Sequence, residues 1–241
     1  IEDCGVYWHS EEFRNNNYHF DKMKTCNKNG IRLLTIFGDE WGDRKDQIKN
    51  FLLSTIGKNP TTIGARKTDL RLVEKKEAKE FLEANHIQGS TTLKMAWGLY
   101  YNNELVAVMT GNKHHRQGQE ATFVLNRLAF KSGVSVQGGA SKLFKALKAY
   151  AKEQGYSKLV SWSDNRWSEG RVYGAMGFSL EENMRPDYSY TKQDLRFSKQ
   201  SCQKKILAKK GGIGSTEKEM ALSLGLYRIW DCGKMRWAMD L

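Results

Sequence analysis

The clearest hydrophobic pattern in this 241-residue chain lies between Leu125 and Phe178. The apolar run 125–130 predicts a buried strand, and 158–162 predicts a second one. Between them, apolar side chains in the segment 142–151 recur at i, i+3, i+4 and i+7, as in an amphipathic helix that ends near Gly155. The order of strand, small-residue loop, helix and strand predicts a β-α-β unit.

The loop of this unit consists of Gly138, Gly139, Ala140 and Ser141. Small residues at a strand-to-helix turn let the backbone approach a ligand, and a helix N-terminus offers unpaired N–H groups to a phosphate. A tightly packed turn that binds nothing explains the same residues, because short glycine motifs give many false positives. Spacing alone leaves both interpretations open.

The rest of the chain also shows an α/β pattern. Before residue 60 we expect a helix ending near residues 29–30, a strand at 31–37 and a helix after 39–41. A linker at 59–62 then leads to a strand at 65–73, a helix at 77–85, a hairpin of 95–101 with 105–110 and a strand at 122–130. The last part of the chain is expected to contain a basic helix at 197–208, a helix capped by Thr216 and ended by Gly225, and a hairpin of 226–230 with 234–237.

The formal net charge of +12 is concentrated away from the N-terminus. Residues 1–59 carry 9 basic and 9 acidic residues, whereas residues 191–241 carry 11 basic and 5 acidic ones, a net of +6. A basic tail favours a polyanion, with DNA as the expected partner, over a merely solubilising surface. The candidate contacts are Lys199, Lys204, Lys205, Arg228, Lys234 and Arg236. A tail hairpin that only covers a sheet edge is the alternative.

The four cysteines are widely scattered and lack zinc-ligand spacing, so no disulfide partner is expected and a reducing compartment is favoured. No apolar run has the length of a membrane span, so no membrane association is expected. Because the chain begins at Ile1 and not at Met, we expect a fragment or a processed product.

Four residues near the N-terminus are candidates for chemistry: Glu2, His9, His19 and Lys22. A carboxylate such as Glu2 can hold Mg²⁺, and a neighbouring His or Lys can position or deprotonate water. A lone histidine beside a tryptophan is more often a packed or surface residue. His114 and His115 lie in a basic loop without a nearby carboxylate, so a phosphate contact or a solvated loop is expected there.

A second candidate site follows the 158–162 strand and contains Trp162, Asp164, Arg166 and Trp167. The tryptophans could stack a base, Asp164 could act as a base or an orienting group, and Arg166 could hold phosphate. One of the two tryptophans is expected to belong to the core.

The segments 128–130 and 138–143, with Tyr173 and the pair Gly177-Phe178, resemble the core of the GNAT acyltransferase fold. The resemblance implies a mixed, mostly antiparallel sheet with flanking helices. It implies that the loop 138–141 holds the pyrophosphate of acetyl-CoA, that the strand with Leu128 and Phe130 pairs with the pantetheine arm, and that Tyr173 protonates the departing thiolate. The family usually has Arg or Gln where this chain has Ser135, and Gln137 lies beside the loop.

The string Ile-Glu-x-x-Gly-x-Tyr-Trp-His at residues 1–9, the pair His19 and Lys22, and the segment 30–41 resemble phage homing endonuclease-like proteins related to the very-short-patch-repair and PD-(D/E)xK nucleases. The resemblance covers most of the chain and implies catalysis by Glu2, His9, His19 and Lys22 with Mg²⁺ on Glu2. The family's preceding strand, with a further metal-binding acid, would lie before Ile1.

The sequence therefore predicts an α/β protein of three segments: a truncated nuclease-like segment at 1–59, a GNAT-like domain at 60–190 and a basic helix-hairpin extension at 191–241. The leading hypothesis is a phage or mobile-element protein of the infected bacterial cytoplasm that cleaves DNA with Mg²⁺ when intact. The alternative is an acetyl-CoA-dependent N-acyltransferase that modifies a nucleobase or a protein amine. A catalytically inactive DNA-binding module is the third possibility.

Overall fold

The computed structural model describes all 241 residues, and the chain divides into two compact units. Unit 1 comprises Ile1–Asp43, Asp164–Glu169 and Asn183–Lys234, and unit 2 comprises Arg44–Ser163, Gly170–Glu182 and Met235–Leu241. This division differs from the three consecutive segments expected from the sequence. Changes in composition along the sequence can suggest only units made of one continuous segment. In this chain each unit consists of three separate segments.

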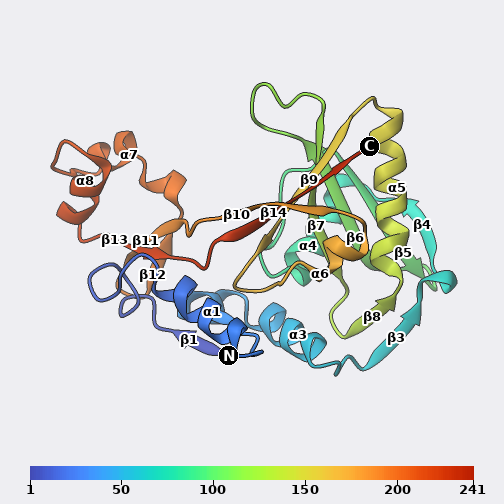
Figure 1. Ribbon diagram of the computed structural model, residues 1–241, viewed down its shortest axis with the longest axis horizontal. Helices are drawn as coiled ribbons and strands as arrows, with labels where there is room; N and C mark the ends of the chain where they lie inside the picture. Colours follow the sequence, from blue (N-terminus) through green and yellow to red (C-terminus); the bar gives the residue numbers. More distant parts are fainter. The chain divides into compact units, whose positions relative to one another are not determined.

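The larger sheet has seven strands in the order β10-β14-β9-β7-β6-β5-β4 (Figure 1). These strands are β4 (Asp69–Leu72), β5 (Met95–Tyr101), β6 (Glu104–Lys113), β7 (Thr122–Phe130), β9 (Lys158–Asp164), β10 (Ser179–Met184) and β14 (Lys234–Asp240). The helices of unit 2 are α3 (Lys45–Thr55), α4 (Lys75–Asn85), α5 (Gly139–Glu153) and α6 (Arg171–Ala175). A separate parallel pair joins β3 (Thr61–Gly64) to β8 (Val134–Gln137).

The predicted β-α-β unit is confirmed as β7, α5 and β9. Strands β4 to β7 pair antiparallel, whereas β7 and β9 pair parallel, so the sheet is mixed and mostly antiparallel. Parallel neighbours need a crossover connection, which α5 supplies. The short strand β8 precedes α5 and was not predicted.

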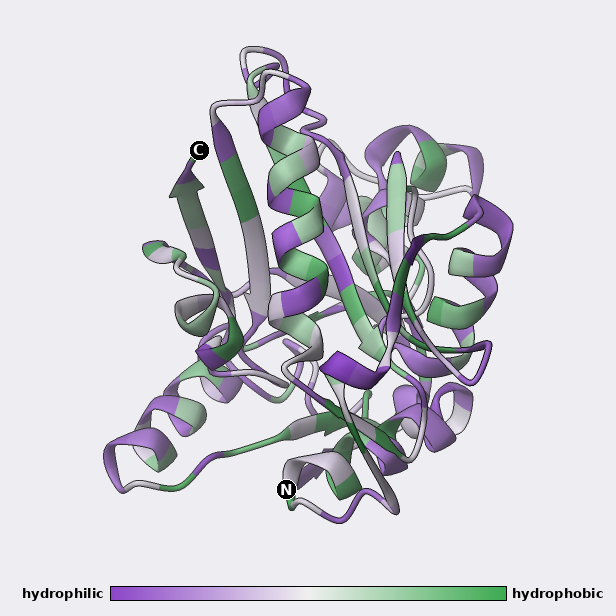
Figure 2. Ribbon diagram, turned by 90° about the vertical axis from the view of Figure 1, so that its right-hand side faces the viewer, coloured by the Kyte–Doolittle hydropathy of each residue, from purple (hydrophilic) through white to green (hydrophobic).

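Helices cover both faces of this sheet because its strands alternate their side chains between two cores. On one face Leu143 and Leu147 of α5 pack with Trp97 and Met109, and on the other Ala78 of α4 packs in a core that includes Ala96 and Val108. Figure 2 shows polar and apolar residues interspersed along the long helix α5, as its predicted amphipathic pattern requires.

The predicted hairpin of β5 and β6 is confirmed. Its turn residues Asn102 and Asn103 have φ of 51° and 62°, and asparagine tolerates this left-handed conformation better than most residues. The predicted helix at 77–85 is confirmed as α4. None of the helices is long and apolar enough to cross a membrane.

Unit 1 contains two small sheets. Strand β1 (Glu2–Cys4) pairs parallel with β2 (Thr35–Phe37), and β11 (Tyr188–Lys192) pairs antiparallel with β12 (Leu195–Phe197) and β13 (Tyr227–Trp230). Its helices are α1 (Tyr18–Lys28), α2 (Gly38–Asp43), α7 (Lys204–Lys209) and α8 (Glu217–Ser223). The predicted cap of α8 is confirmed, because Thr216 and Glu219 form a reciprocal capping box.

Two predicted strands and one predicted linker are corrected. The strand expected at 31–37 is restricted to β2, whose three residues are all buried. The strand expected at 65–73 begins as a 3₁₀ turn, η1 (Ala65–Lys67), because Thr68 bonds back to the Ala65 carbonyl through both its N–H and its hydroxyl. The linker expected at 59–62 leads directly into β3.

The basic helix expected at 197–208 is wrong. Ser198 and Gln203 both have extended backbones, with ψ of 149° and 148°, and they interrupt the helical path. Between them lies only the 3₁₀ turn η2 (Lys199–Cys202), which the Ser198 hydroxyl caps by accepting the Ser201 N–H. The helix that follows, α7, has 6 residues.

The hairpin expected from 226–230 and 234–237 is also wrong. Strand β13 pairs with β11, while β14 belongs to the seven-stranded sheet. Between these strands the Asp231 carboxylate accepts the N–H groups of Asp187 and Gly233. Gly233 has φ of +74°, and a Cβ there would lie 2.4 Å from the Met184 carbonyl oxygen. Only glycine therefore allows the chain to pass this close to the segment that contains Met184.

A buried network of charges supports unit 1. Arg166 donates from Nη1 to both carboxylate oxygens of Glu40 at 2.9 Å, and its Nη2 lies 3.2 Å from Asp164 Oδ2. Arg196 contacts the same Glu40 at 2.8 Å and Asp39 at 3.0 Å. Burial acts to raise the pKa of Glu40, but the two guanidinium groups outweigh it and lower that pKa overall.

We expect Arg166→Met to destabilise the protein by about 3–5 kcal/mol, because it removes the charge that two buried carboxylates face. Urea unfolding followed by circular dichroism measures this change. The matched control is Lys218→Met, which removes a half-exposed lysine 3.2 Å from Glu11 and should cost less than about 1 kcal/mol. Equal effects of the two substitutions would contradict a supporting role for the Arg166 network.

Candidate functional site

The central feature of unit 2 is the point where β7 and β9 separate. Their parallel ladder runs from Thr122 opposite Lys158 to Val124 opposite Val160. At the next position the buried Ser161 hydroxyl donates to the Leu125 carbonyl at 2.8 Å, so a side chain replaces the strand-to-strand bond. Beyond Leu125 the edge of β7 that faces away from β6 has no ladder partner.

This free edge presents the backbone groups of Leu128 and Phe130. The N–H of Lys131 donates to Val106 of β6 at 2.8 Å, and backbone groups of successive residues point to opposite edges of a strand. The N–H and C=O groups of Phe130 and Leu128 therefore point away from β6. An extended ligand arm can pair with them as an added strand would.

The N-terminus of α5 lies at the end of this strand region. Gly138 precedes the helix with φ of +77°, no side chain caps it, and the Lys142 N–H makes the bond to the Gly138 carbonyl. The N–H groups of Gly139, Ala140 and Ser141 are consequently left for a ligand. Partial positive charge at such a terminus suits a phosphate group, so these residues fit the pyrophosphate of CoA.

Close packing favours glycine at the first position of this helix. A Cβ on Gly139 would lie 3.0 Å from Phe130 Cε1 and from Val136. Lys142 does not extend toward a phosphate, because its ammonium group donates to the carbonyls of Ala65 and Thr68. Lys142 thus connects the start of α5 to the backbone at Ala65 and Thr68, while the N–H groups of Gly139, Ala140 and Ser141 stay free.

Tyr173 of α6 reaches the strand separation. Its hydroxyl lies 3.0 Å from Ser161 Oγ and donates to the Trp162 carbonyl at 3.2 Å. Burial raises the pKa of the Tyr173 phenol, and the opposing effects of Ser161 and Arg127 are smaller. The phenol is therefore protonated at neutral pH, which is the state that a general acid requires.

Sequence analysis missed Ser161 and Trp237 as residues of this site. The Trp237 ring stacks on Tyr173 with centroids 5.6 Å apart, and its Nε1 donates to Ser163 at 2.9 Å. Gly170, with φ of +73°, leaves room for that ring, since a Cβ would lie 2.1 Å from Trp237 Cζ2. A polar Ser161 in an apolar strand was an available signal, whereas no local pattern connects Trp237 with Tyr173.

The residues of the second predicted site divide between the two units. Trp162 belongs to unit 2, and Asp164, Arg166 and Trp167 belong to unit 1. Arg166 is not available to a phosphate, because Glu40 and Asp164 already occupy its guanidinium group. Trp167 is buried, in line with the expectation that one tryptophan is structural.

The four N-terminal candidates meet as two pairs in unit 1. The Lys22 ammonium donates to Glu2 Oε1 at 2.6 Å, and His9 Nδ1 lies 2.9 Å from His19 Nε2. Burial lowers the pKa of His19 to about 4 and also lowers that of His9, so both imidazoles are neutral at pH 7.

These surroundings do not fit the Mg²⁺ expected on Glu2. The potential metal ligands that converge in this unit are two imidazoles and the thiol of Cys4, and the Lys22 ammonium already contacts one carboxylate oxygen of Glu2. Mg²⁺ prefers carboxylate, phosphate and water oxygens in octahedral geometry. We therefore derive no magnesium-dependent step from this site.

The six basic residues predicted to contact DNA also divide between the units. Arg236 lies in unit 2 and pairs with Glu181 at 2.9 Å, whereas Lys199 pairs with Asp187 at 2.9 Å in unit 1. The Arg228 guanidinium lies 4.3 Å from the centre of the Tyr188 ring. Lys204 and Lys205 are exposed at the start of α7, and Lys234 is half-buried.

In this α/β domain the free edge of β7 leads to the uncapped N-terminus of α5. This arrangement suits a long ligand that contains phosphate. The family model described as "Acetyltransferase (GNAT) family" matches residues 66–178, slightly less than half of the chain, so this segment is similar to a GNAT acetyltransferase domain. The GNAT resemblance expected from the sequence is thereby confirmed for this part of the chain.

Solved structures with a likeness to the chain include an IAA acetyltransferase from Bacillus cereus (15% identity, 72% of this chain, 99% of that chain, TM-score 0.43). A second is the ribosomal-protein-S18-alanine N-acetyltransferase from Escherichia coli (10% identity, 72% of this chain, 93% of that chain, TM-score 0.43). A third is a GNAT family acetyltransferase from Elizabethkingia anophelis with acetyl-CoA bound (15% identity, 73% of this chain, 99% of that chain, TM-score 0.38). No curated protein matches. Because the TM-scores of these structures are low, the GNAT assignment depends on the family model. Neither the family model nor the solved structures support the resemblance to nucleases.

Proposed function

We propose that the domain at residues 66–178 is an acetyl-CoA-dependent N-acyltransferase. The observation that carries this proposal is the joint position of three features in a GNAT domain: the free edge of β7, the uncapped N-terminus of α5 and the hydroxyl of Tyr173 beside Ser161. The three features are contributed by the β-α-β unit and the short helix that follows it.

Each feature has one task in this proposal. The N–H groups of Gly139, Ala140 and Ser141 hold the pyrophosphate, and the backbone of Leu128 and Phe130 pairs with the pantetheine arm. When bound, acetyl-CoA supplies an acyl group activated as a thioester.

Tyr173 carries the proton that the departing thiolate sulfur needs, and Ser161 and Trp237 keep the phenol in place. The acceptor is a neutral amine, because an ammonium group has no lone pair for the attack. A nucleobase amine and a protein amine remain the two acceptor classes.

We expect Ser141→Glu to weaken acetyl-CoA binding by at least about tenfold. The exposed Ser141 is the third residue of α5, where a carboxylate is compatible with the helix but repels a phosphate and competes for the same N–H groups. Isothermal titration calorimetry with the full chain measures the dissociation constant.

Ala149→Glu is the control for this experiment, since it adds the same charge at an exposed position farther along α5 and should leave binding unchanged. If the wild-type chain releases no heat with acetyl-CoA and shows no binding in equilibrium dialysis, the acyltransferase proposal fails.

We expect Tyr173→Phe to lower kcat by about 10²–10⁴-fold while the dissociation constant of acetyl-CoA stays the same, because only the proton donor is lost. Release of the CoA thiol is followed with a panel of peptides bearing free amines and of nucleosides. Tyr101→Phe, a tyrosine on β5 that makes no comparable contact, is the control. An unchanged kcat in Tyr173→Phe would remove Tyr173 as the general acid.

We also propose that unit 1 binds DNA through the lysines that open α7. The net charge of +6 over residues 191–241 favours this second function, and Lys204 and Lys205 are exposed there. Such binding neutralises backbone phosphates and releases counterions, so its strength falls as salt rises.

For this function we expect the double substitution Lys204→Ala/Lys205→Ala to make the slope of log K against log salt less negative by about 2. Fluorescence anisotropy of a labelled duplex at several salt concentrations measures the slope. Lys75→Ala/Lys76→Ala is the control, because these two exposed lysines open α4 in the same way. Identical slopes for wild type and the α7 variant would contradict a DNA contact at α7.

A further inference from the structure

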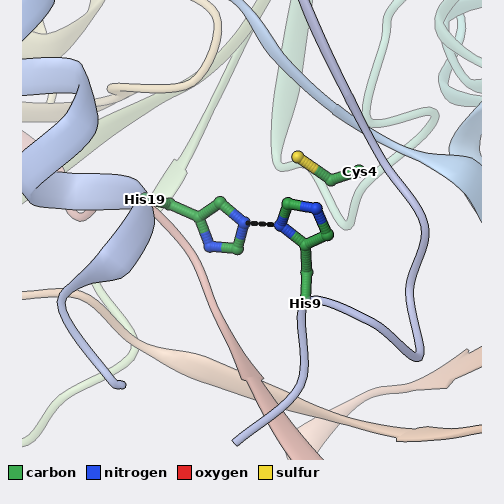
Figure 3. A group of neighbouring side chains, drawn as sticks. All are labelled: Cys4, His9 and His19. Carbon is green, nitrogen blue, oxygen red and sulfur yellow. Dashed lines mark hydrogen bonds between the residues drawn. The ribbon is translucent and has the colours of Figure 1, made fainter. Parts of the chain in front are cut away.

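Three potential metal ligands meet in unit 1, although their positions in the sequence do not suggest it. The sulfur of Cys4 and one ring nitrogen each from His9 and His19 lie within 4.8 Å of one another. Figure 3 shows the two imidazole rings facing each other, with the Cys4 sulfur beside them. The facing atoms are His9 Nδ1 and His19 Nε2, which are 2.9 Å apart.

Three backbone elements position these side chains. Cys4 is the last residue of β1 and pairs with Phe37 of β2. His9 follows in a turn closed by its own N–H on the Gly5 carbonyl at 3.1 Å, and His19 lies in the first turn of α1. The edge of the His19 ring packs against Phe37, so the cluster is supported by the small core of this unit.

The orientation of His19 leaves the correct nitrogen for a metal. His19 Nδ1 lies 2.7 Å from the Trp230 carbonyl oxygen, which can only accept, so Nδ1 carries the proton. In the neutral ring the lone pair is then on Nε2, the atom that faces His9. A backbone carbonyl on the second ring nitrogen is the usual arrangement for a histidine that binds a metal.

Glu2 gives a second, independent indication of a missing ligand. Glu2 and Cys4 lie two residues apart on β1, so their side chains project from the same face. The Glu2 side chain is 10% exposed, and its Oε2 is buried without a hydrogen-bond partner while Oε1 accepts from Lys22. A buried carboxylate oxygen without a partner is unfavourable, and a cation would stabilise it.

We propose that Cys4 Sγ, His9 Nδ1 and His19 Nε2 bind one Zn²⁺, with the buried carboxylate of Glu2 as a nearby negative charge. Thiolate, imidazole and carboxylate donors in a four-coordinate set are the ligands of zinc in proteins, whereas Mg²⁺ takes oxygen donors in octahedral geometry. On binding, the Cys4 thiol releases its proton to solvent. The proton that His9 Nδ1 donates to His19 Nε2 without metal leaves Nδ1, and His9 takes up a proton from solvent on Nε2. Zinc bonds of about 2.0–2.3 Å bring tetrahedral ligand atoms close together, and these three atoms already lie within 4.8 Å of one another.

The first test measures zinc in the purified chain without added affinity histidines. After incubation with Zn²⁺ and removal of free metal by desalting, mass spectrometry of the metal content should show about one Zn²⁺ per wild-type chain. His9→Ala should retain almost none, and this partly exposed residue can be replaced with the least risk to folding. His115→Ala should retain zinc, although His114 and His115 also stack as a pair.

The second test uses Co²⁺ as a spectroscopic probe of the sulfur ligand. The wild-type chain should show a thiolate-to-cobalt charge-transfer band and the visible bands of a tetrahedral ion. Cys4→Ser should lose the charge-transfer band, and Cys26→Ser, which removes the half-buried thiol of α1, should keep it. Glu2→Gln should lower the affinity for Zn²⁺ at least tenfold.

Two results would overturn the proposal. One is a wild-type chain that retains no zinc, which would leave a simple hydrogen bond between two histidines. The other is equal zinc retention in wild type and His9→Ala, which would place the metal elsewhere on the chain. Both readouts are independent of acetyltransferase activity, so they do not depend on the function proposed for unit 2.

Discussion

The separation of β7 from β9 is the constraint on which unit 2 depends. The two strands are parallel, so a helix must connect them, and α5 covers one face of the sheet as a result. Because their ladder stops after Val124 and Val160, the backbone beyond it is free on one edge. The Ser161 hydroxyl bonds to Leu125 at this point and lies beside Tyr173, so one buried serine connects the free edge with the candidate general acid.

The two units are stabilised in different ways. Unit 2 has extensive apolar cores on both faces of its sheet, whereas the buried apolar clusters of unit 1 are small. In unit 1 the guanidinium groups of Arg166 and Arg196 lie 4.9 and 4.6 Å from the centre of the Phe37 ring and share the carboxylate of Glu40. The charged residues therefore act as part of the interior, and Arg166, which the sequence predicts to hold phosphate, instead pairs with Glu40 and Asp164.

The elements that depend on residues close together in the sequence were predicted correctly. The period of apolar residues identified α4 and α5, the residue pair Asn102-Asn103 identified a hairpin, and Thr216 with Glu219 identified a cap. Patterns failed where the partner is distant: β13 and β14 are adjacent in sequence but belong to different sheets. For the candidate site, the resemblance to GNAT proteins supplied Leu128, Phe130 and Tyr173, but nothing local connects Trp237 with Tyr173.

At the N-terminal cluster, the tertiary structure favours a different ion from the Mg²⁺ that the sequence predicts. The carboxylate of Glu2 and the nuclease resemblance predict Mg²⁺, whereas the four scattered cysteines, Cys4 among them, predict no metal site. Cysteine spacing identifies a zinc site only when its ligands are close in sequence, as in a zinc finger. Here one thiol and two histidines come from a strand, a turn and a helix, so their approach depends on the pairing of β1 with β2 and on the bond from His19 to Trp230. Both are tertiary features, so the sequence alone does not reveal that a thiol and two imidazoles lie together here.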